Sequence, residues 1–234
     1  GIDQEKFTAV RTARTKVTKP YRDRMECKYQ WCIAAVPGKA WAKKVFPDLM
    51  VNKAVETLWD YILKASRADG PDPVREWARH NDALASRCDH LNRLGLTALE
   101  YHSSNGTDFK VGLIPDSVFM GGGEETVKGR YFNPNIPSEE IFISPKAGEA
   151  EGIVYSTKPL SYQGELIENF SVRFEGGRAV EVKAEKNQHL LEKMIAMDEG
   201  AAMLGECALI AYDSPINNQG ILYYNTLFDE NASC

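Results

Sequence analysis

Three glutamates stand in short apolar runs of this chain, where a charged side chain is unusual. Glu139 and Glu140 open the sequence EEIFIS, and Glu206 lies inside the sequence LGECALI. A buried carboxylate is costly unless it is paired with a cation or bound to a metal. Two such residues from separate strands could converge on one cation or act as acid and base. Ordinary buried ion pairs are the alternative, and spacing alone leaves both interpretations open.

The adjacent pair Glu139 and Glu140 predicts a division of roles. Successive side chains of a strand point to opposite faces, so one glutamate can point inward while the other meets solvent. Alternation alone leaves open which of the two glutamates points inward.

Other familiar catalytic signatures are absent from the sequence. It contains no Walker loop, no HExxH and no Gly-x-Ser-x-Gly. The run Gly121-Gly122-Gly123 predicts a surface loop more readily than a phosphate cradle. No two histidines have the i, i+4 spacing that places two imidazoles on one helical face, and we expect His80 and His90 at the surface or its boundary.

Cysteine content and charge indicate a cellular setting. The five cysteines are scattered and odd in number, which fits reduced thiols in the cytoplasm, and Cys207 is expected to be a small core residue. The formal net charge of -5 argues against a nucleic-acid partner. No apolar run approaches the ~20 residues needed to cross a bilayer. A cluster of basic residues predicts a solvated helix face: Arg11, Arg14, Lys16, Lys19, Arg22 and Arg24.

The first part of the chain carries mainly helical patterns. Residues 29–37 form an apolar run closed by proline and predict a buried strand. Apolar residues at helical spacing predict a helix over 48–67. A second helix is expected to begin with Asp72 as N-cap and Pro73 in its first turn, and to end at Gly95.

After residue 95 the patterns change to strands. Strands are expected over 96–102, 108–115, 139–144, 152–162, 165–175, 179–184, 204–212 and 221–224, with one helix over 188–197. The fold class is therefore α/β plus α+β. We expect a partial α/β N-terminal domain over residues 1–95 and a β-rich, largely antiparallel catalytic domain over 96–234, incomplete at its C-terminus. The chain opens with Gly1 instead of Met, which also suggests a portion of a longer protein.

Two long motifs stand out, NIPSEEIF over residues 135–142 and YNTLFDENASC over residues 224–234. They resemble segments of the aminopeptidase T family of metallo-aminopeptidases, which includes the AmpS and PepS enzymes. Residues 135–142 read NIPSEEIF and resemble the family segment N-[MI]-P-T-E-E-V-F, with Ser138 where threonine is usual. Residues 105–108 (NGTD) resemble a G-T-D segment. Residues 204–216 resemble L-G-E-V-A-L-V…D-S-P-I, and residues 224–234 resemble Y-N-T-L-F-D-E-N-A-S-C. The resemblance extends over nearly the whole chain, in order.

What the resemblance implies is an exopeptidase that removes N-terminal residues from peptides with a two-metal activated water. In that family the second glutamate of the E-E pair and the glutamate of L-G-E bind metal and serve catalysis, which here means Glu140 and Glu206. Glu139 is then expected to face solvent or to lie behind the site, and it is the alternative ligand if the strand has the opposite phase. The family's remaining ligands, a histidine directly after N-A-S-C and a later H-x-D pair, and its catalytic tyrosine fall beyond Cys234. The chain alone is therefore expected to show little activity.

Two divalent ions, zinc, cobalt or manganese, suit carboxylate and imidazole ligands. Such ions lie ~4 Å apart, so we expect Glu140 and Glu206 to be largely buried and close together. The resemblance also implies a homodimer built through the β-rich half, with peptides as substrates. Two rival hypotheses remain: a non-catalytic fragment of such an enzyme, and an α/β binding module whose buried glutamates are structural.

Overall fold

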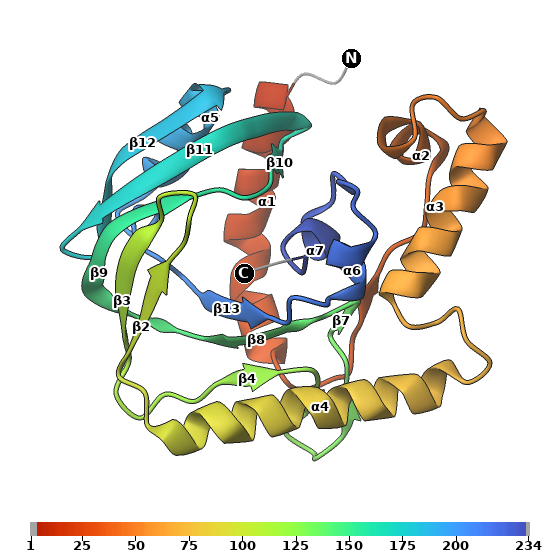
Figure 1. Cartoon of the computed structure of the whole chain (residues 1–234), viewed down its shortest axis with the longest axis horizontal. Helices are drawn as coiled ribbons and strands as arrows, with labels where there is room; N and C mark the ends of the chain where they lie inside the picture. The colour runs from red at the N-terminus through yellow and green to blue at the C-terminus, as the bar shows by residue number, and fades with distance from the viewer. Residues whose placement is uncertain (1–3, 233–234) are drawn as a thin grey trace. The chain divides into compact units, whose positions relative to one another are not determined.

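A computed structural model describes residues 4–232 (Figure 1). Contacts divide these residues into two compact units. One comprises the described residues up to Ile33 together with Gly123–Pro134, and the other comprises Ala34–Gly122 with the residues from Asn135 onward. These limits follow contacts within the fold, and the domain boundary expected after residue 95 stays a prediction.

The first unit is built on the long helix α1 (Gln4–Met25) and the two-stranded pair β5 (Glu124–Glu125) and β6 (Tyr131–Phe132). Lys19 pairs with Asp23 one turn along α1 at 2.7 Å. The expected solvated helix face is confirmed for the basic residues whose side chains are described: Arg14, Lys16, Lys19, Arg22 and Arg24.

The second unit holds the main antiparallel sheet. The path β10-β11-β9-β3-β2 is completed by β12, which pairs with β11. These strands are β2 (Ala98–His102), β3 (Asp108–Leu113), β9 (Pro145–Tyr155), β10 (Leu160–Tyr162), β11 (Glu165–Glu175) and β12 (Arg178–Lys186). Helix α5 (Gln188–Ile195) packs on β12 and β11. The largely antiparallel character expected from the strand patterns is confirmed.

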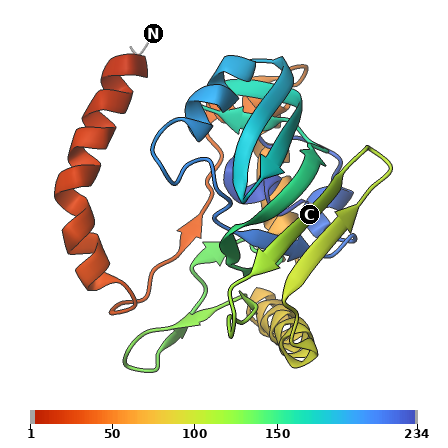
Figure 2. The same cartoon turned by 90° about the vertical axis from the view of Figure 1, so that its left-hand side faces the viewer.

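A smaller sheet carries the candidate site. Its order is β13-β8-β4, and all pairs are antiparallel: β4 (Met120–Gly121), β8 (Glu140–Ile143) and β13 (Cys207–Ile210). The short strand β7 (Asn135–Ile136) precedes β8 in the chain. Helix α4 (Pro73–Leu94) runs along β4 and β8, and Figure 2 shows it nearly end-on below the β2–β3 hairpin.

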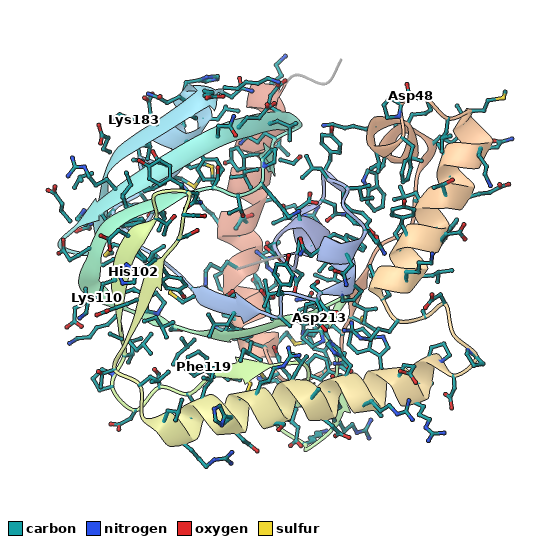
Figure 3. The ribbon with its side chains drawn as sticks, in the orientation of Figure 1. Asp48, His102, Lys110, Phe119, Lys183 and Asp213 are labelled. Atoms are coloured by element: carbon teal, nitrogen blue, oxygen red, sulfur yellow. The ribbon has the colours of Figure 1, made fainter. Side chains whose placement is uncertain are left out.

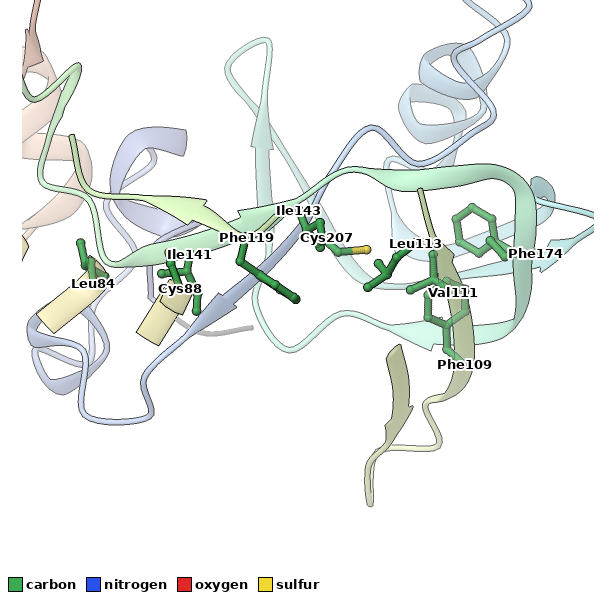
Figure 4. Packing of buried hydrophobic residues seen from close by; sticks show 11 residues of the cluster. Leu84, Cys88, Phe109, Val111, Leu113, Phe119, Ile141, Ile143, Phe174 and Cys207 are labelled. Atoms are coloured by element: carbon green, nitrogen blue, oxygen red, sulfur yellow. The ribbon is translucent and has the colours of Figure 1, made fainter. Parts of the chain in front are cut away.

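Helix α4 begins and ends where the sequence predicts. Asp72 accepts a hydrogen bond from the backbone N–H of Arg75, and Gly95 ends the helix in the left-handed conformation at φ 60°. Leu84 and Cys88 on its inner face join a core with the β-strands (Figure 4). Cys207 of β13 belongs to the same cluster, which confirms its expected role as a small core residue.

A second core joins the two ends of this unit. Helices α2 (Lys39–Val45) and α3 (Val51–Ala65) pack against α6 (Pro215–Asn218) and α7 (Thr226–Asp229). The largest fully buried side chains are Tyr223 and Phe228, whose rings stack at 4.4 Å. Trp41 donates its indole N–H to the carbonyl of Tyr223 at 2.5 Å, so the early helices fix the segment that leads into α7.

Two strand predictions are wrong. Residues 29–37 are mostly exposed and only β1 (Ile33–Ala34) is extended; Trp31 packs against Phe132 instead of entering a sheet. Residues 221–224 form no strand because the Asp229 carboxylate accepts the backbone N–H groups of Tyr223 and Asn225, at 2.7 and 2.9 Å. Those donors are no longer available to a sheet.

Candidate metal centre

The pairing of β8 with β13 decides which way Glu140 points. Ile141 and Ile143 are buried in the cluster against α4. Because side chains alternate along a strand, Glu140 and Phe142 lie on the opposite face. Ile210 is the partner of Glu140 in the ladder, so these two share that face.

Glu206 directly precedes β13, four residues before Ile210. Continuing the strand alternation places it on the same face as Glu140. The negative charge of Glu206 raises the pKa of Glu140, so the two carboxyl groups interact. The expectation that Glu206 is largely buried is wrong: it is exposed, because it lies before the strand begins and follows the exposed Gly205.

The environment of Glu140 disfavours a negative charge. Its pKa is raised to about 7, first by desolvation because the side chain is partly buried, then by the charges of Glu206 and Glu230. A hydrogen bond from the side chain of Asn231 acts in the other direction. Near neutral pH this carboxyl group is therefore poised to gain a cation, either a proton or a metal ion.

Glu230 is a third member of the group, and sequence reasoning missed it. It follows the last residue of α7, and its pKa is raised by partial desolvation, then by the charges of Glu206 and Asp229. Part of its surface nevertheless reaches solvent. Its signal in the sequence was its place in the DENASC segment, but its proximity to Glu140 and Glu206 depends on the tertiary fold.

Asn231 links this face of β8 to the other one. It is only 1% exposed, its Oδ1 accepts the backbone N–H of Glu139 at 2.7 Å, and its side chain also donates to Glu140. Ser214 donates its hydroxyl to the Asn231 carbonyl at 2.9 Å. The end of α7 is thereby held against the start of β8.

Glu139 points the other way and is fully paired. It is 2% exposed and binds the guanidinium of Arg67 through both oxygens, with the Nη2–Oε2 distance at 2.9 Å. His80 Nε2 lies 3.8 Å from the same carboxylate and donates to the carbonyl of Ser138 at 2.7 Å. The predicted alternation of the two glutamates is confirmed, but Glu139 meets an ion pair and not solvent.

The histidines stand apart from the carboxylate group. His80 is buried, contrary to the surface or boundary position expected for it, because Trp77 and Glu139 enclose its ring. His102 lies at the exposed β2–β3 hairpin, 3.1 Å from Asp108 (Figure 3). His90 and His189 are exposed on α4 and α5.

The donor chemistry on the Glu140 face fits a hard divalent cation. Within residues 4–232, no lysine, arginine or histidine forms an ion pair with Glu140, Glu206 or Glu230. Carboxylate oxygens without a basic partner are suitable ligands for such ions. Over the same described residues, no three His, Cys, Asp or Glu side chains are grouped closely enough to hold a metal ion by themselves.

Similarity to known proteins shows which family this chain belongs to. The sequence model of a family described as thermophilic metalloprotease (M29) matches residues 1–234. The chain belongs to the M29 metalloprotease family. Aminopeptidase AmpS of Bacillus subtilis is 42% identical over the whole chain, and aminopeptidase T of Thermus thermophilus is 40% identical.

The M29 fold is also seen in a solved structure. Wild-type AmpT from Thermus thermophilus matches with a TM-score of 0.91 and 38% identity, covering 100% of this chain and 57% of that one. The chain likewise spans 57% of the length of AmpS.

Among the helices of the described residues, none combines the length and apolar character needed to cross a membrane.

Proposed function

We propose that the full-length protein containing this chain is a metal-dependent aminopeptidase that removes N-terminal residues from peptides. Glu140 and Glu206 would be ligands to two divalent cations, zinc, cobalt or manganese, and Glu230 would add negative charge beside them. The supporting observation is the group of interacting carboxylates on one face of the β13-β8-β4 sheet, with no basic partner among the described residues. The M29 relatives bear the name aminopeptidase.

When bound, the two ions would supply a water of lowered pKa and polarise the scissile carbonyl. The chain's own contribution is to hold the ligands. Strand β8 fixes the backbone of Glu140 by pairing with β13, and Asn231 orients its carboxylate. The combined negative charge of the three glutamates also attracts the protonated amino terminus of a peptide.

The rival hypothesis of purely structural glutamates fits Glu139 but not Glu140. Glu139 has both oxygens on Arg67. Glu140 instead is partly buried beside two other carboxylates, an arrangement that costs stability unless a cation or a proton neutralises it. Natural chains retain such arrangements chiefly at functional sites.

The test is metal content and peptide hydrolysis in the full-length protein. Purified with Mn²⁺, Co²⁺ or Zn²⁺, it should release N-terminal amino acids from unblocked peptides and leave N-acetylated peptides intact. A chelator should abolish the activity, and re-addition of the ion should restore it. Undiminished hydrolysis by metal-free protein would refute the proposal.

We further propose that the full-length protein is a cytoplasmic homodimer formed through the β-rich half, as the family resemblance implies. Enclosure of the site between two copies would limit access to short peptides. Sedimentation of the full-length protein should give twice the monomer mass, and a monomeric mass at micromolar concentration would contradict this assembly.

A further inference from the structure

A cavity of about 250 Å³ opens beside Glu230. Its wall is the segment that joins β9 to β10, together with one side chain of β11 and the start and end of α7. Figure 1 shows α7 beside this part of the sheet. Its lining includes Tyr155, Ser156, Lys158, Ser161, Phe170 and Glu230.

Among the residues that the structure describes, Lys158 is the only basic one that lines this cavity. It is partly buried, and its positive charge lowers the pKa of Asp229, although desolvation dominates and the net shift of Asp229 is upward. Among residues 4–232, its ammonium group has no carboxylate within ion-pair distance. Asp229 is committed elsewhere, since both of its oxygens accept backbone N–H groups. The Lys158 ammonium is therefore able to accept an anionic ligand.

The segment that carries Lys158 is held firmly at its base. The Ser156 N–H donates to the carbonyl of Phe170 at 2.8 Å, and the Phe170 N–H donates to the Ser156 hydroxyl at 3.0 Å. The Tyr155 N–H donates to the Thr107 hydroxyl at 3.0 Å, and Asn105 donates to the Tyr155 carbonyl at 3.3 Å. The NGTD turn thus fixes the position of this wall, a role that the motif alone does not reveal.

We propose that this cavity binds the part of the substrate beyond the scissile bond, and that Lys158 pairs with a substrate carboxylate there. The inference rests on the proposed aminopeptidase function. Glu230 belongs both to the carboxylate group and to the cavity wall, so a peptide held at the first reaches the second. Two extended residues span roughly 7 Å, a length compatible with a cavity of this size.

The ligand is therefore a short peptide with a carboxylate one residue beyond the cleaved bond. That carboxylate is either the α-carboxylate of a dipeptide or an acidic side chain. The remaining lining suits such a peptide: Tyr155 and Phe170 offer apolar surface, and Ser156 and Ser161 offer hydroxyl groups. Charge pairing with a partly buried lysine favours the acid over its neutral amide.

The experiment compares Leu-Gly, Leu-Gly-amide and Leu-Asp-amide as substrates of the full-length, Mn²⁺-loaded protein. We expect kcat/KM for Leu-Gly to exceed that for Leu-Gly-amide by about tenfold, the effect of one ion pair of moderate strength. Lys158→Met should remove this preference by lowering kcat/KM for Leu-Gly, with less than about a twofold change for the amide. Lys158→Arg should retain it.

A matched control is Lys193→Met, an exposed lysine of α5 outside the cavity, which should leave all three rates unchanged. Hydrolysis of Leu-Asp-amide at the Leu-Gly rate assigns the site to any carboxylate at that position; hydrolysis at the Leu-Gly-amide rate assigns it to the α-carboxylate. Equal losses on acid and amide in Lys158→Met, or no wild-type preference, would overturn the proposal.

A calorimetric binding experiment separates this inference from the proposed function. If the protein cleaved no peptide, the aminopeptidase function would fall. Weaker binding of Leu-Gly to Lys158→Met than to wild type would still support the cavity. Equal binding to the two proteins would overturn it.

Discussion

Glu139 and Glu140 are neighbours in sequence, yet their surroundings are opposite. Glu139 is buried beside His80 of α4, and its charge is neutralised by Arg67, which follows the end of α3. Glu140 lies on the other face of the strand, where Glu206 and Glu230 add negative charge and Asn231 is a neutral donor. Within the described residues, the carboxylate on one face of the strand is neutralised by an arginine, and those on the other face have no basic partner.

This difference favours a structural role for Glu139 and supports the proposed metal-binding role of Glu140. A buried ion pair with good geometry needs nothing further, and removing one partner leaves the other uncompensated. A group of carboxylates without a basic partner stores unfavourable free energy that a cation can relieve. Burial alone would have favoured Glu139, the more buried residue, as the ligand. The carboxylates beside Glu140, with no basic partner among the described residues, support Glu140 as the proposed ligand.

The largest expected effect is on activity, and it comes from removing the charge of Glu140 or Glu206. Glu140→Gln and Glu206→Gln in the full-length protein should each lower peptide hydrolysis by about 10³-fold or more, since glutamine keeps the shape but loses the charge that binds a cation. Bound metal, measured by elemental analysis, should fall in parallel. Thermal stability without metal should stay the same or rise. Normal turnover and metal content in both variants would end the metal-site assignment.

Removing the charge of Glu139, which is already paired with Arg67, should lower the stability of the fold instead. Glu139→Gln leaves Arg67 without its partner and should cost about 3 kcal/mol of unfolding free energy, at the low end for buried pairs because Arg67 keeps a quarter of its surface in water. Glu139→Gln is thus a test of stability and not a mild control for Glu140→Gln. Urea unfolding measures the loss, and metal content per folded molecule should be unchanged. If Glu139→Gln lost bound metal but kept its stability, Glu139 and not Glu140 would be the metal-binding residue.

Asn231 forms hydrogen bonds with both Glu139 and Glu140, so its substitutions test the difference between these two residues. Asn231→Ala removes the acceptor for the Glu139 N–H and the donor to Glu140, and should cost about 2 kcal/mol, typical for a buried polar group left unpaired. Asn231→Asp keeps the acceptor but adds a charge beside Glu140. That variant should be destabilised without metal and should recover more stability than wild type when Mn²⁺ is added. Equal gains in wild type and variant would count against a cation at Glu140.

The smallest expected effect is a pH dependence of stability that comes from His80, which lies beside Glu139. Desolvation lowers the pKa of the buried His80 below its usual value of about 6.5, so the unfolded chain binds a proton more readily than the folded one. Stability from this residue is therefore complete above pH 6.5 and is lost as pH falls toward the lowered folded pKa. His80→Gln should flatten the pH dependence of the urea midpoint between pH 7 and 5. An unchanged slope would show that His80 does not contribute.

Local chemistry made several elements predictable. Asp72 and Gly95 set the ends of α4 through a cap and a left-handed turn, which depend only on neighbouring residues. The failures have a different cause. Residues 221–224 carry a strand-like sequence, but Asp229 accepts the N–H groups of Tyr223 and of Asn225 just after this segment. No propensity scale includes a carboxylate that lies beyond the segment itself.

The sequence by itself determined the family resemblance, the two candidate ligands Glu140 and Glu206, and the alternation that separates Glu140 from Glu139. These follow from motif, residue type and the two-residue period of a strand. Only the tertiary structure decided that Arg67 neutralises Glu139, that Glu230 joins the carboxylates, and that Lys158 faces a cavity beside them. The reason is distance along the chain: Glu139 lies 72 residues from Arg67, and electrostatic energy depends on separation in space, which folding alone establishes.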